Sequence, residues 1–206
     1  MSLLAGIARP LAWPVFMAAF RVRVIGRENI PKTGGAILAG NHVSYMDPVL
    51  LWEFTPRRVH FMAKSELFKG LIGWMLNAFY AFPVVRGSAD RASITAATKL
   101  LVDAELVGIF PEGTRSQDGQ AGEAHGGVSF IAMRAGVPVI PVACVGTDKV
   151  LPRGQKFVRP ARVTIKFGEP IDTASFTEGS RKERMDALTG TIMMRIGEEL
   201  DAARRL

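Results

Sequence analysis

The chain has 206 residues, of which 48% are hydrophobic and 22% are charged. This length suits one domain with a well-developed core and is short for two, and the composition excludes extended disorder. Lysine and arginine exceed aspartate and glutamate by 26 to 19, so the protein should be attracted to anionic surfaces or ligands. A nucleic-acid partner is disfavoured, because the basic residues are scattered and no zinc-finger, basic-zipper or aromatic recognition pattern is present.

The cysteine and histidine content argues against two further classes. Cys144 is the single cysteine, which excludes an internal disulfide and a multi-cysteine metal site and agrees with a cytosolic chain. His42, His60 and His125 are far apart and show no ligand spacing. The sequence therefore predicts neither a metal site nor a bound cofactor.

The first twenty residues are unusually apolar, with Arg9 as their one charge and two prolines. A membrane-spanning helix needs about 20 uninterrupted apolar residues, and a secretory signal carries its positive charge ahead of the apolar run. Neither pattern fits well. An interfacial helix that carries Trp13, Phe16 and Phe20 into the lipid headgroups fits better. The alternative is a first helix packed on the core.

Beyond residue 20, short β-rich runs alternate with longer helical patterns. Strands are expected at residues 21–25, 36–39, 59–62, 84–85, 107–110, 139–145 and 163–167. Helices are expected at residues 48–54, 66–79, 90–105, 128–135 and 181–205. Several strands are apolar throughout, as central strands covered on both faces are. The pattern predicts a single α/β domain at residues 21–206, with a mixed, largely parallel sheet flanked by helices, behind an apolar, membrane-associating helix at residues 1–20.

Two polar motifs follow strands of this predicted sheet. The strand at 36–39 leads into residues 41–47, Asn-His-Val-Ser-Tyr-Met-Asp, and the strand at 107–110 leads into residues 111–115, Pro-Glu-Gly-Thr-Arg. Ligands of such sheets gather beyond the carboxyl ends of the strands. We therefore expect both motifs to belong to one site.

The first motif pairs His42 with Asp47, which precedes Pro48. Five residues of regular helix would separate the two side chains by roughly 140°, so they meet only if the stretch is a turn that leads into a helix. Asp-Pro is a helix-start signal and implies that turn. The carboxylate can then hold one imidazole nitrogen and leave the other as a general base. The alternative is that Asp47 is only an N-cap and His42 is structural.

The second motif combines Glu112, Gly113, Thr114 and Arg115. Arginine grips a phosphate through two parallel hydrogen bonds, and glycine lets backbone amides approach it closely. A surface turn without a ligand is the alternative.

Two further cations support an anion site. Lys64 and Arg86 each end a predicted strand. Each alone is an ordinary solvated charge, but polar or cationic residues at four strand ends of one sheet indicate an anion pocket.

No residue stands out as a covalent nucleophile. Cys144 lies inside an apolar strand, and Ser44 lacks the strand–turn–helix context of a nucleophile elbow. Direct transfer of a group to an acceptor is therefore the simpler mechanism.

Together the motifs resemble those of the glycerolipid acyltransferase superfamily, specifically the bacterial 1-acyl-sn-glycerol-3-phosphate acyltransferases, from about residue 20 to 170. Residues 41–47 match the family pattern Asn-His-x-Ser-x-x-Asp, and residues 110–116 match Phe-Pro-Glu-Gly-Thr-Arg-Ser. Residues 82–86 and 137–142 resemble two further family blocks, and the lysine of Phe-Met-Ala-Lys at residues 61–64 is also a family feature. The chain departs from the family pattern at Tyr80, where glycine is usual, and at His125, where Phe-Lys is usual; both departures are expected near the acceptor or acyl channel. Its N-terminal segment is also shorter than that of many members.

The resemblance implies a function and a set of roles. His42 would deprotonate the acceptor hydroxyl, Asp47 would hold His42, and the acyl group would come from coenzyme A or acyl carrier protein. The acceptor would be bound by Lys64, Arg86, Glu112, Gly113, Thr114 and Arg115.

The implied product is phosphatidic acid, made from lysophosphatidic acid at an anionic membrane, with the protein peripheral or monotopic on the cytoplasmic face of the cell membrane. Glycerol 3-phosphate or another lysolipid as acceptor, and a non-catalytic membrane- or acyl-carrier-binding protein, are the alternatives.

Overall fold

The computed structural model describes residues 3–84, 91–113, 126–155 and 157–206, with side chains from residue 9 onward. The strands are β1 (Arg23–Ile25), β2 (Ala36–Gly40), β3 (Val59–Lys64), β4 (Phe82–Val84), β5 (Leu106–Ile109), β6 (Val139–Val145) and β7 (Thr164–Phe167). The helices are α1 (Leu3–Phe20), α2 (Met46–Phe54), α3 (Gly70–Ala78), α4 (Arg91–Val102), α5 (Gly127–Ala135), α6 (Thr147–Val150) and α7 (Arg181–Arg204). Single 3₁₀ turns lie at Arg27–Asn29, Ser65–Leu67 and Thr173–Ser175.

Within the described residues the strands form one seven-stranded sheet in the order β1-β7-β6-β2-β5-β3-β4. The five strands from β6 to β4 are parallel to one another. β7 is antiparallel to β6 and parallel to β1. The prediction of a single α/β domain with a mixed, largely parallel sheet is confirmed.

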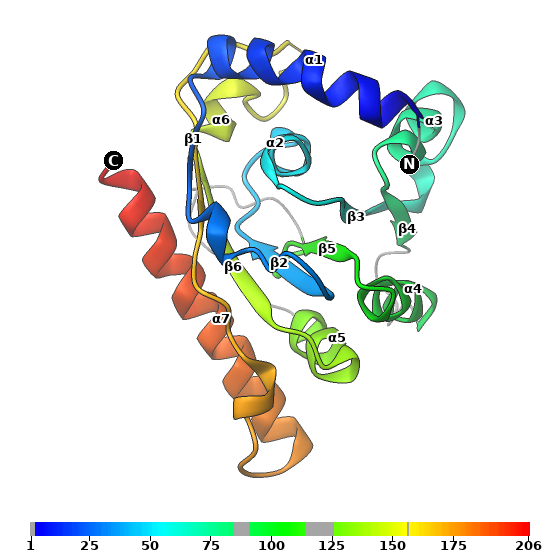
Figure 1. The fold of residues 1–206 in the computed structure, drawn as a ribbon, viewed down its shortest axis with the longest axis vertical. Helices are drawn as coiled ribbons and strands as arrows, with labels where there is room; N and C mark the ends of the chain where they lie inside the picture. Colours follow the sequence, from blue (N-terminus) through cyan, green and yellow to red (C-terminus); the bar gives the residue numbers. More distant parts are fainter. Residues whose placement is uncertain (1–2, 85–90, 114–125, 156) are drawn as a thin grey trace.

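Helices cover both faces of the sheet (Figure 1). Side chains alternate between the faces along each strand, so Leu38 packs into one core cluster with α1 and α2, while Ile37 and Ala39 pack into the other with α4, α5 and α7. All three side chains are buried. This two-sided burial explains why β2, β5 and β6 are apolar throughout.

The N-terminal helix α1 rests on α2 through one of its faces. Trp13 packs on Phe54 with ring centroids 4.6 Å apart, and Phe20 is buried in the same cluster. Arg9 donates hydrogen bonds to the backbone carbonyl oxygens of Glu53 and Thr55. The single charge of the segment therefore fixes α1 to the end of α2.

The opposite face of α1 is apolar and exposed. Leu11, Val15 and Met17 are 67%, 61% and 38% exposed. Across the described residues, no helix has both the length and the apolarity that a bilayer crossing requires. The expectation that Trp13, Phe16 and Phe20 enter the lipid headgroups is wrong, because all three side chains pack against the core cluster beside α2. The alternative of a first helix packed on the core is the one that the structure shows, although Leu11 and Val15 remain exposed.

Element boundaries differ from the expected ones by a few residues. α2 begins at Met46, two residues before the expected start at Pro48, and β4 begins at Phe82 rather than at residue 84. β4 contains Pro83, which cannot donate a ladder hydrogen bond, and it is tolerated because β4 is the edge strand. The short helix α6 had no sequence signal.

Candidate active site

The carboxyl ends of parallel strands bring the predicted site residues to one edge of the sheet. β2, β5 and β3 are parallel neighbours, and they lead into His42, Glu112 and Lys64 respectively. Lys64 is the exposed last residue of β3. Arg86, Thr114 and Arg115 lie outside the described residues, as does His125.

His42 and Asp47 form the hydrogen-bonded pair that the turn was expected to allow. His42 Nδ1 lies 2.8 Å from Asp47 Oδ2. The same oxygen accepts hydrogen bonds from the backbone amides of Val43 and Ser44, both at 2.8 Å. The Asp47 side chain is fully buried and that of His42 is 13% exposed. The carboxylate therefore fixes the imidazole with Nδ1 as the protonated nitrogen.

Asp47 does not act as a simple N-cap. It lies in the first turn of α2, behind Tyr45 at the N-cap, and its carboxylate reaches back to the turn that precedes the helix. Its second oxygen, Oδ1, is buried without a hydrogen bond among the described residues. The Asp47 carboxylate therefore serves the imidazole and the preceding turn rather than the free amides of α2.

The second motif meets the first through an aromatic contact. The ring of Phe110 stacks on the imidazole of His42, with centroids 4.2 Å apart and planes at 15°, and Phe61 continues the stack behind it. After Phe110 the chain turns: Gly113 has a φ of +64° and its amide donates to the Phe110 carbonyl oxygen at 3.0 Å. Glu112, in this turn, is only 6% exposed. A glycine is required at this left-handed position.

Two long-range contacts that the sequence did not predict fix residues 41–47, the turn that carries His42 and that we propose below as the catalytic turn. Asn41 exchanges two hydrogen bonds with the backbone of Cys144, on β6, at 3.0 and 2.8 Å. The Ser44 hydroxyl donates to the carbonyl oxygen of Leu151 at 3.1 Å. Both partners lie more than 100 residues away, and only the β2–β6 pairing brings them close. A buried asparagine at a strand end was the available signal.

The structure gives neither Cys144 nor Ser44 the setting of a nucleophile. Burial raises the pKa of the Cys144 thiol well above its ordinary value, and the negative charge of Asp47 raises it further. Ser44 is fully buried, with its hydroxyl committed to Leu151. His42 therefore has a buried carboxylate on one side and no activated nucleophile among these neighbours.

Tyr80 lies away from this edge. Its ring contacts His60, with centroids 5.6 Å apart, and lies under the Arg58 guanidinium at 4.7 Å. Arg58 immediately precedes β3, so this contact is at the opposite end of that strand from Lys64. Burial lowers the pKa of His60 and favours its neutral form. Tyr80 thus packs against the amino-terminal side of the sheet, not beside His42.

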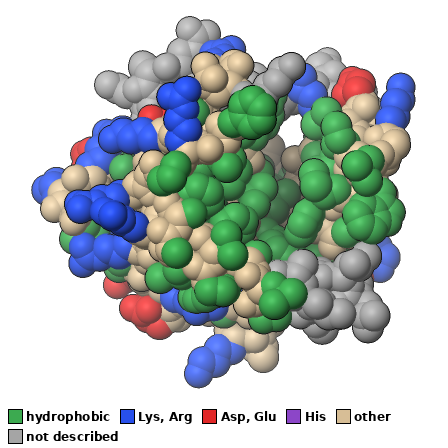
Figure 2. Space-filling model, turned by 90° about the horizontal axis from the view of Figure 1, so that it is seen from above, with side chains coloured by type: hydrophobic (Ala, Val, Ile, Leu, Met, Phe, Trp, Pro, Cys, Tyr) green, Lys and Arg blue, Asp and Glu red, His purple; other side chains and the backbone are tan. Residues whose placement is uncertain are grey.

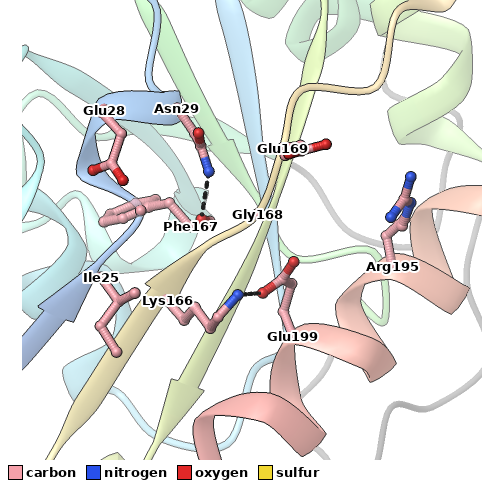
Figure 3. Close-up of a pocket in the computed structure, with 10 residues that line it drawn as sticks. Ile25, Glu28, Asn29, Lys166, Phe167, Gly168, Glu169, Arg195 and Glu199 are labelled. Atoms are coloured by element: carbon pink, nitrogen blue, oxygen red, sulfur yellow. Dashed lines mark hydrogen bonds and ion pairs between the residues drawn. The ribbon is translucent and has the colours of Figure 1, made fainter.

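A hollow between β7, α7 and the turn after β1 is also remote from the motifs (Figure 3). Two polar contacts cross it: Lys166 pairs with Glu199, and the Asn29 amide donates to the Phe167 carbonyl oxygen at 3.0 Å. None of the predicted site residues lines it. The hollow therefore lies where β7, the strand antiparallel to β6, packs beside α7.

Fold and site together define a class: an α/β protein with a histidine that is hydrogen bonded to a buried carboxylate at the carboxyl edge of a largely parallel sheet. Comparison of the chain with known proteins identifies its family. A family profile described as Acyltransferase matches residues 21–145. That match covers more than half of the chain, which therefore belongs to the acyltransferase family.

Individual relatives within this family share a more specific name. The chain is 35% identical over 179 residues to a 1-acyl-sn-glycerol-3-phosphate acyltransferase of Bacillus subtilis, covering 86% of this chain and 87% of that one. A chloroplastic 1-acyl-sn-glycerol-3-phosphate acyltransferase of Arabidopsis thaliana is 28% identical over 88% of this chain, which spans 50% of its length. The crystal structure of the 1-acyl-sn-glycerophosphate acyltransferase PlsC from Thermotoga maritima superposes with a TM-score of 0.73 at 29% identity, over 96% of this chain and 77% of that one.

Proposed function

We propose that this acyltransferase moves a fatty acyl group from acyl-CoA or acyl carrier protein to the sn-2 hydroxyl of 1-acyl-sn-glycerol 3-phosphate, giving phosphatidic acid for phospholipid biosynthesis. The hydrogen bond from His42 Nδ1 to the buried Asp47 is the observation that carries the mechanism. The substrate assignment draws on the relatives, which are named for this reaction.

The chemistry needs one general base. Nε2 of His42 takes the proton of the acceptor hydroxyl as its oxygen attacks the thioester carbonyl. The new ester C–O bond forms, the C–S bond breaks, and the departing thiolate receives the proton back from the imidazolium. Asp47 stabilises that imidazolium, because its carboxylate is buried and already hydrogen bonded to Nδ1. No covalent acyl-enzyme is required.

The acceptor phosphate is assigned to cations and amides at neighbouring strand ends. Lys64 lies at the end of β3, and Gly113 turns the chain after β5. Arg86 and Arg115 follow β4 and β5 in the sequence. Arginine pairs bidentately with phosphate, and we assign both arginines to the acceptor phosphate because the strands that precede them in the sequence, β4 and β5, end at the edge of the sheet where His42 lies. Thr114 and Glu112 complete the proposed acceptor site.

A membrane partner follows from the distribution of apolar side chains. α1 exposes Leu11 and Val15, and α3 exposes Leu71, Ile72 and Trp74 at 79%, 55% and 56%. Apolar patches of this kind mark interaction surfaces. We assign this surface to an anionic bilayer, since the acceptor and the product are themselves lipids, and we place the protein peripherally or monotopically on the cytoplasmic face.

A panel of acceptors tests the proposal. Lysophosphatidic acid, glycerol 3-phosphate, monoacylglycerol and lysophosphatidylcholine are offered with palmitoyl and oleoyl thioesters of coenzyme A and of acyl carrier protein. We expect phosphatidic acid to form fastest from lysophosphatidic acid. A faster reaction of glycerol 3-phosphate or another lysolipid would identify the alternative acceptor. No turnover with any combination of acceptor and thioester would refute the proposal that the protein is this acyltransferase.

The phosphate contact has its own control within this panel. Arg115→Ala should raise KM for lysophosphatidic acid by about tenfold or more, because a charge-assisted pair is lost. KM for monoacylglycerol, which has no phosphate, should not change. An equal rise for both acceptors would show that Arg115 does not bind the phosphate.

A further inference from the structure

The segment between α6 and β7 carries charge of one sign. From Lys149 to Gly168 the sequence contains no aspartate or glutamate. Its cations are Lys149, Arg153, Lys156, Arg159, Arg162 and Lys166. Of these, Arg153, Arg159 and Arg162 are exposed, and Lys156 lies outside the described residues. Residues 151–162, called the arginine segment below, therefore attract anionic surfaces.

Two apolar side chains project from the same segment. Phe157 is 81% exposed and Val158 is 53% exposed. Isolated exposed hydrophobic residues are common on soluble proteins, but here an aromatic and a β-branched residue are adjacent and flanked by arginines. Apolar side chains among cations are the composition of segments that lie in the headgroup region of anionic bilayers.

Three contacts fix the two ends of the arginine segment. The Val163 amide donates to the carbonyl oxygen of Phe20, the last residue of α1, at 3.1 Å. The Arg159 amide donates to the Val150 carbonyl oxygen at 2.8 Å and closes the loop. At the other end the Leu151 carbonyl oxygen accepts the hydrogen bond of Ser44. The segment thus joins the end of α1 directly to the catalytic turn.

The arginine segment lies beside α1, which exposes the apolar side chains of Leu11 and Val15. Figure 1 draws α6 and the chain that follows it beside α1. Seen from above, hydrophobic side chains occupy the middle of the face, and Lys and Arg side chains gather mostly towards its left margin (Figure 2). A basic margin beside an apolar surface complements a bilayer with anionic headgroups.

We propose that the arginine segment is a second membrane contact, separate from α1, that holds the catalytic turn at the bilayer surface. Phe157 and Val158 enter the headgroup region, while Arg153, Arg159 and Arg162 pair with lipid phosphates. Through Leu151 and Ser44 the contact places the turn that carries His42 next to the surface from which a lysolipid is drawn. The inference rests on the proposed lipid acceptor.

An acidic acyl carrier protein is the competing occupant of a basic surface. It would explain the arginines but not an aromatic side chain that is 81% exposed. The hydrogen bond from Val163 to Phe20 also places the segment beside α1, whose exposed face is apolar. The bilayer accounts for the charge, the aromatic residue and the neighbour together.

The test uses the full-length chain and sedimentation with vesicles. Two variants are compared with wild type: Phe157→Ser/Val158→Ser, and Arg153→Ser/Arg159→Ser/Arg162→Ser. Met194→Ser, a 55%-exposed apolar residue on α7, is the matched control. Vesicles are of phosphatidylcholine alone or with phosphatidylglycerol. Acylation of a short-chain, water-soluble lysophosphatidic acid measures the chemistry without a membrane.

On anionic vesicles the Phe157/Val158 variant should bind about tenfold more weakly, and the arginine variant about fivefold more weakly per arginine removed. The arginine effect should vanish on phosphatidylcholine alone, and Met194→Ser should bind as wild type does. Activity on the soluble acceptor should stay within about twofold of wild type, since neither variant alters the catalytic turn.

Unchanged vesicle binding by the Phe157/Val158 variant overturns the inference, as does an equal loss in Met194→Ser. Normal vesicle binding with a rate loss confined to acyl carrier protein as donor also overturns it and identifies the carrier as the occupant. Failure of wild type to acylate the soluble acceptor refutes the proposed function instead, and is read independently of vesicle binding.

Discussion

The two helical layers of the sheet distribute polarity in opposite ways. In the layer of α4, α5 and α7, helix side chains fully buried against the sheet are apolar or small, and most charged residues of α7 are exposed. In the layer of α1 and α2 the charged residues Asp47 and Glu53 are fully buried, while Leu11 and Val15 are exposed. One layer follows the rule for a protein in water, and the other departs from it on both its inner and its outer side.

We interpret the α4, α5 and α7 layer as serving mainly stability, and the α1 and α2 layer as serving the proposed function. Burying a carboxylate costs stability unless it is well paired, and exposing apolar surface forgoes hydrophobic stabilisation. Among the described residues, the α7 layer pairs its least exposed carboxylate, that of Glu199, with Lys166, and its large exposed apolar side chains are one on α4, Val102, and one on α7, Met194. The α1 and α2 layer accepts both costs: Asp47 and Glu53 are buried at opposite ends of α2, and Leu11 and Val15 are exposed on α1. Asp47 holds the proposed base, and the exposed side chains belong to the proposed bilayer contact.

The largest effect is expected from the buried charge of the α2 layer. Asp47→Asn keeps the size of the side chain but removes the negative charge that holds Nδ1 of His42 protonated and stabilises the imidazolium. We expect turnover to fall by about 10²- to 10⁴-fold, with the thermal unfolding midpoint near that of wild type. Steady-state kinetics measures the first and calorimetry the second. Turnover within threefold of wild type would show that the pair is structural.

A core substitution in the α7 layer should affect stability and not chemistry. Ile192 is 1% exposed on α7, so Ile192→Ala should lower the free energy of unfolding by about 2–5 kcal/mol. Met194→Ala, on the exposed side of the same helix, should change it by less than about 0.5 kcal/mol. Denaturant titration distinguishes the two. A similar loss for both would contradict the assignment of the faces of α7.

Removing an exposed apolar side chain should weaken membrane binding when the residue lies on α3 and not when it lies on α4. Trp74→Ser on α3 should weaken binding to anionic vesicles by about tenfold. Val102→Ser changes a 69%-exposed residue on α4, in the other layer, and should leave binding unchanged. Co-sedimentation measures both. An equal loss of vesicle binding in both variants would contradict the assignment of the membrane contact to the α3 side of the molecule.

The smallest effect concerns Glu53, whose pKa is raised by burial, with Arg9 opposing the rise. A raised folded-state pKa means that the folded protein retains the proton more tightly than the unfolded chain does. The stabilisation is complete below the ordinary value of 4.5 and is lost as pH rises through the higher folded value. The free energy of unfolding of wild type, relative to Glu53→Gln, should therefore fall as pH rises from 4.5 towards neutrality. A constant or rising difference would contradict the burial argument.

Much of the fold could be predicted because local patterns dominate it. The apolar runs of β2, β5 and β6 and the Asp-Pro step in the first turn of α2 each report on their immediate surroundings. The His42–Asp47 hydrogen bond could likewise be anticipated, since it spans five residues. The contacts of Asn41 with Cys144 and of Ser44 with Leu151 could not, because they depend on which strands become neighbours. Tyr80 was expected near the acceptor or acyl channel, but its partners Arg58 and His60 lie at the other end of β3.

The most direct test of the whole account is the turnover of purified His42→Ala protein with lysophosphatidic acid and an acyl thioester, in vesicles that wild type and variant bind equally. The account predicts phosphatidic acid formation at least about 10²-fold below wild type, with unchanged unfolding and unchanged vesicle binding. Formation of phosphatidic acid at the wild-type rate by a folded, membrane-bound His42→Ala protein would contradict it.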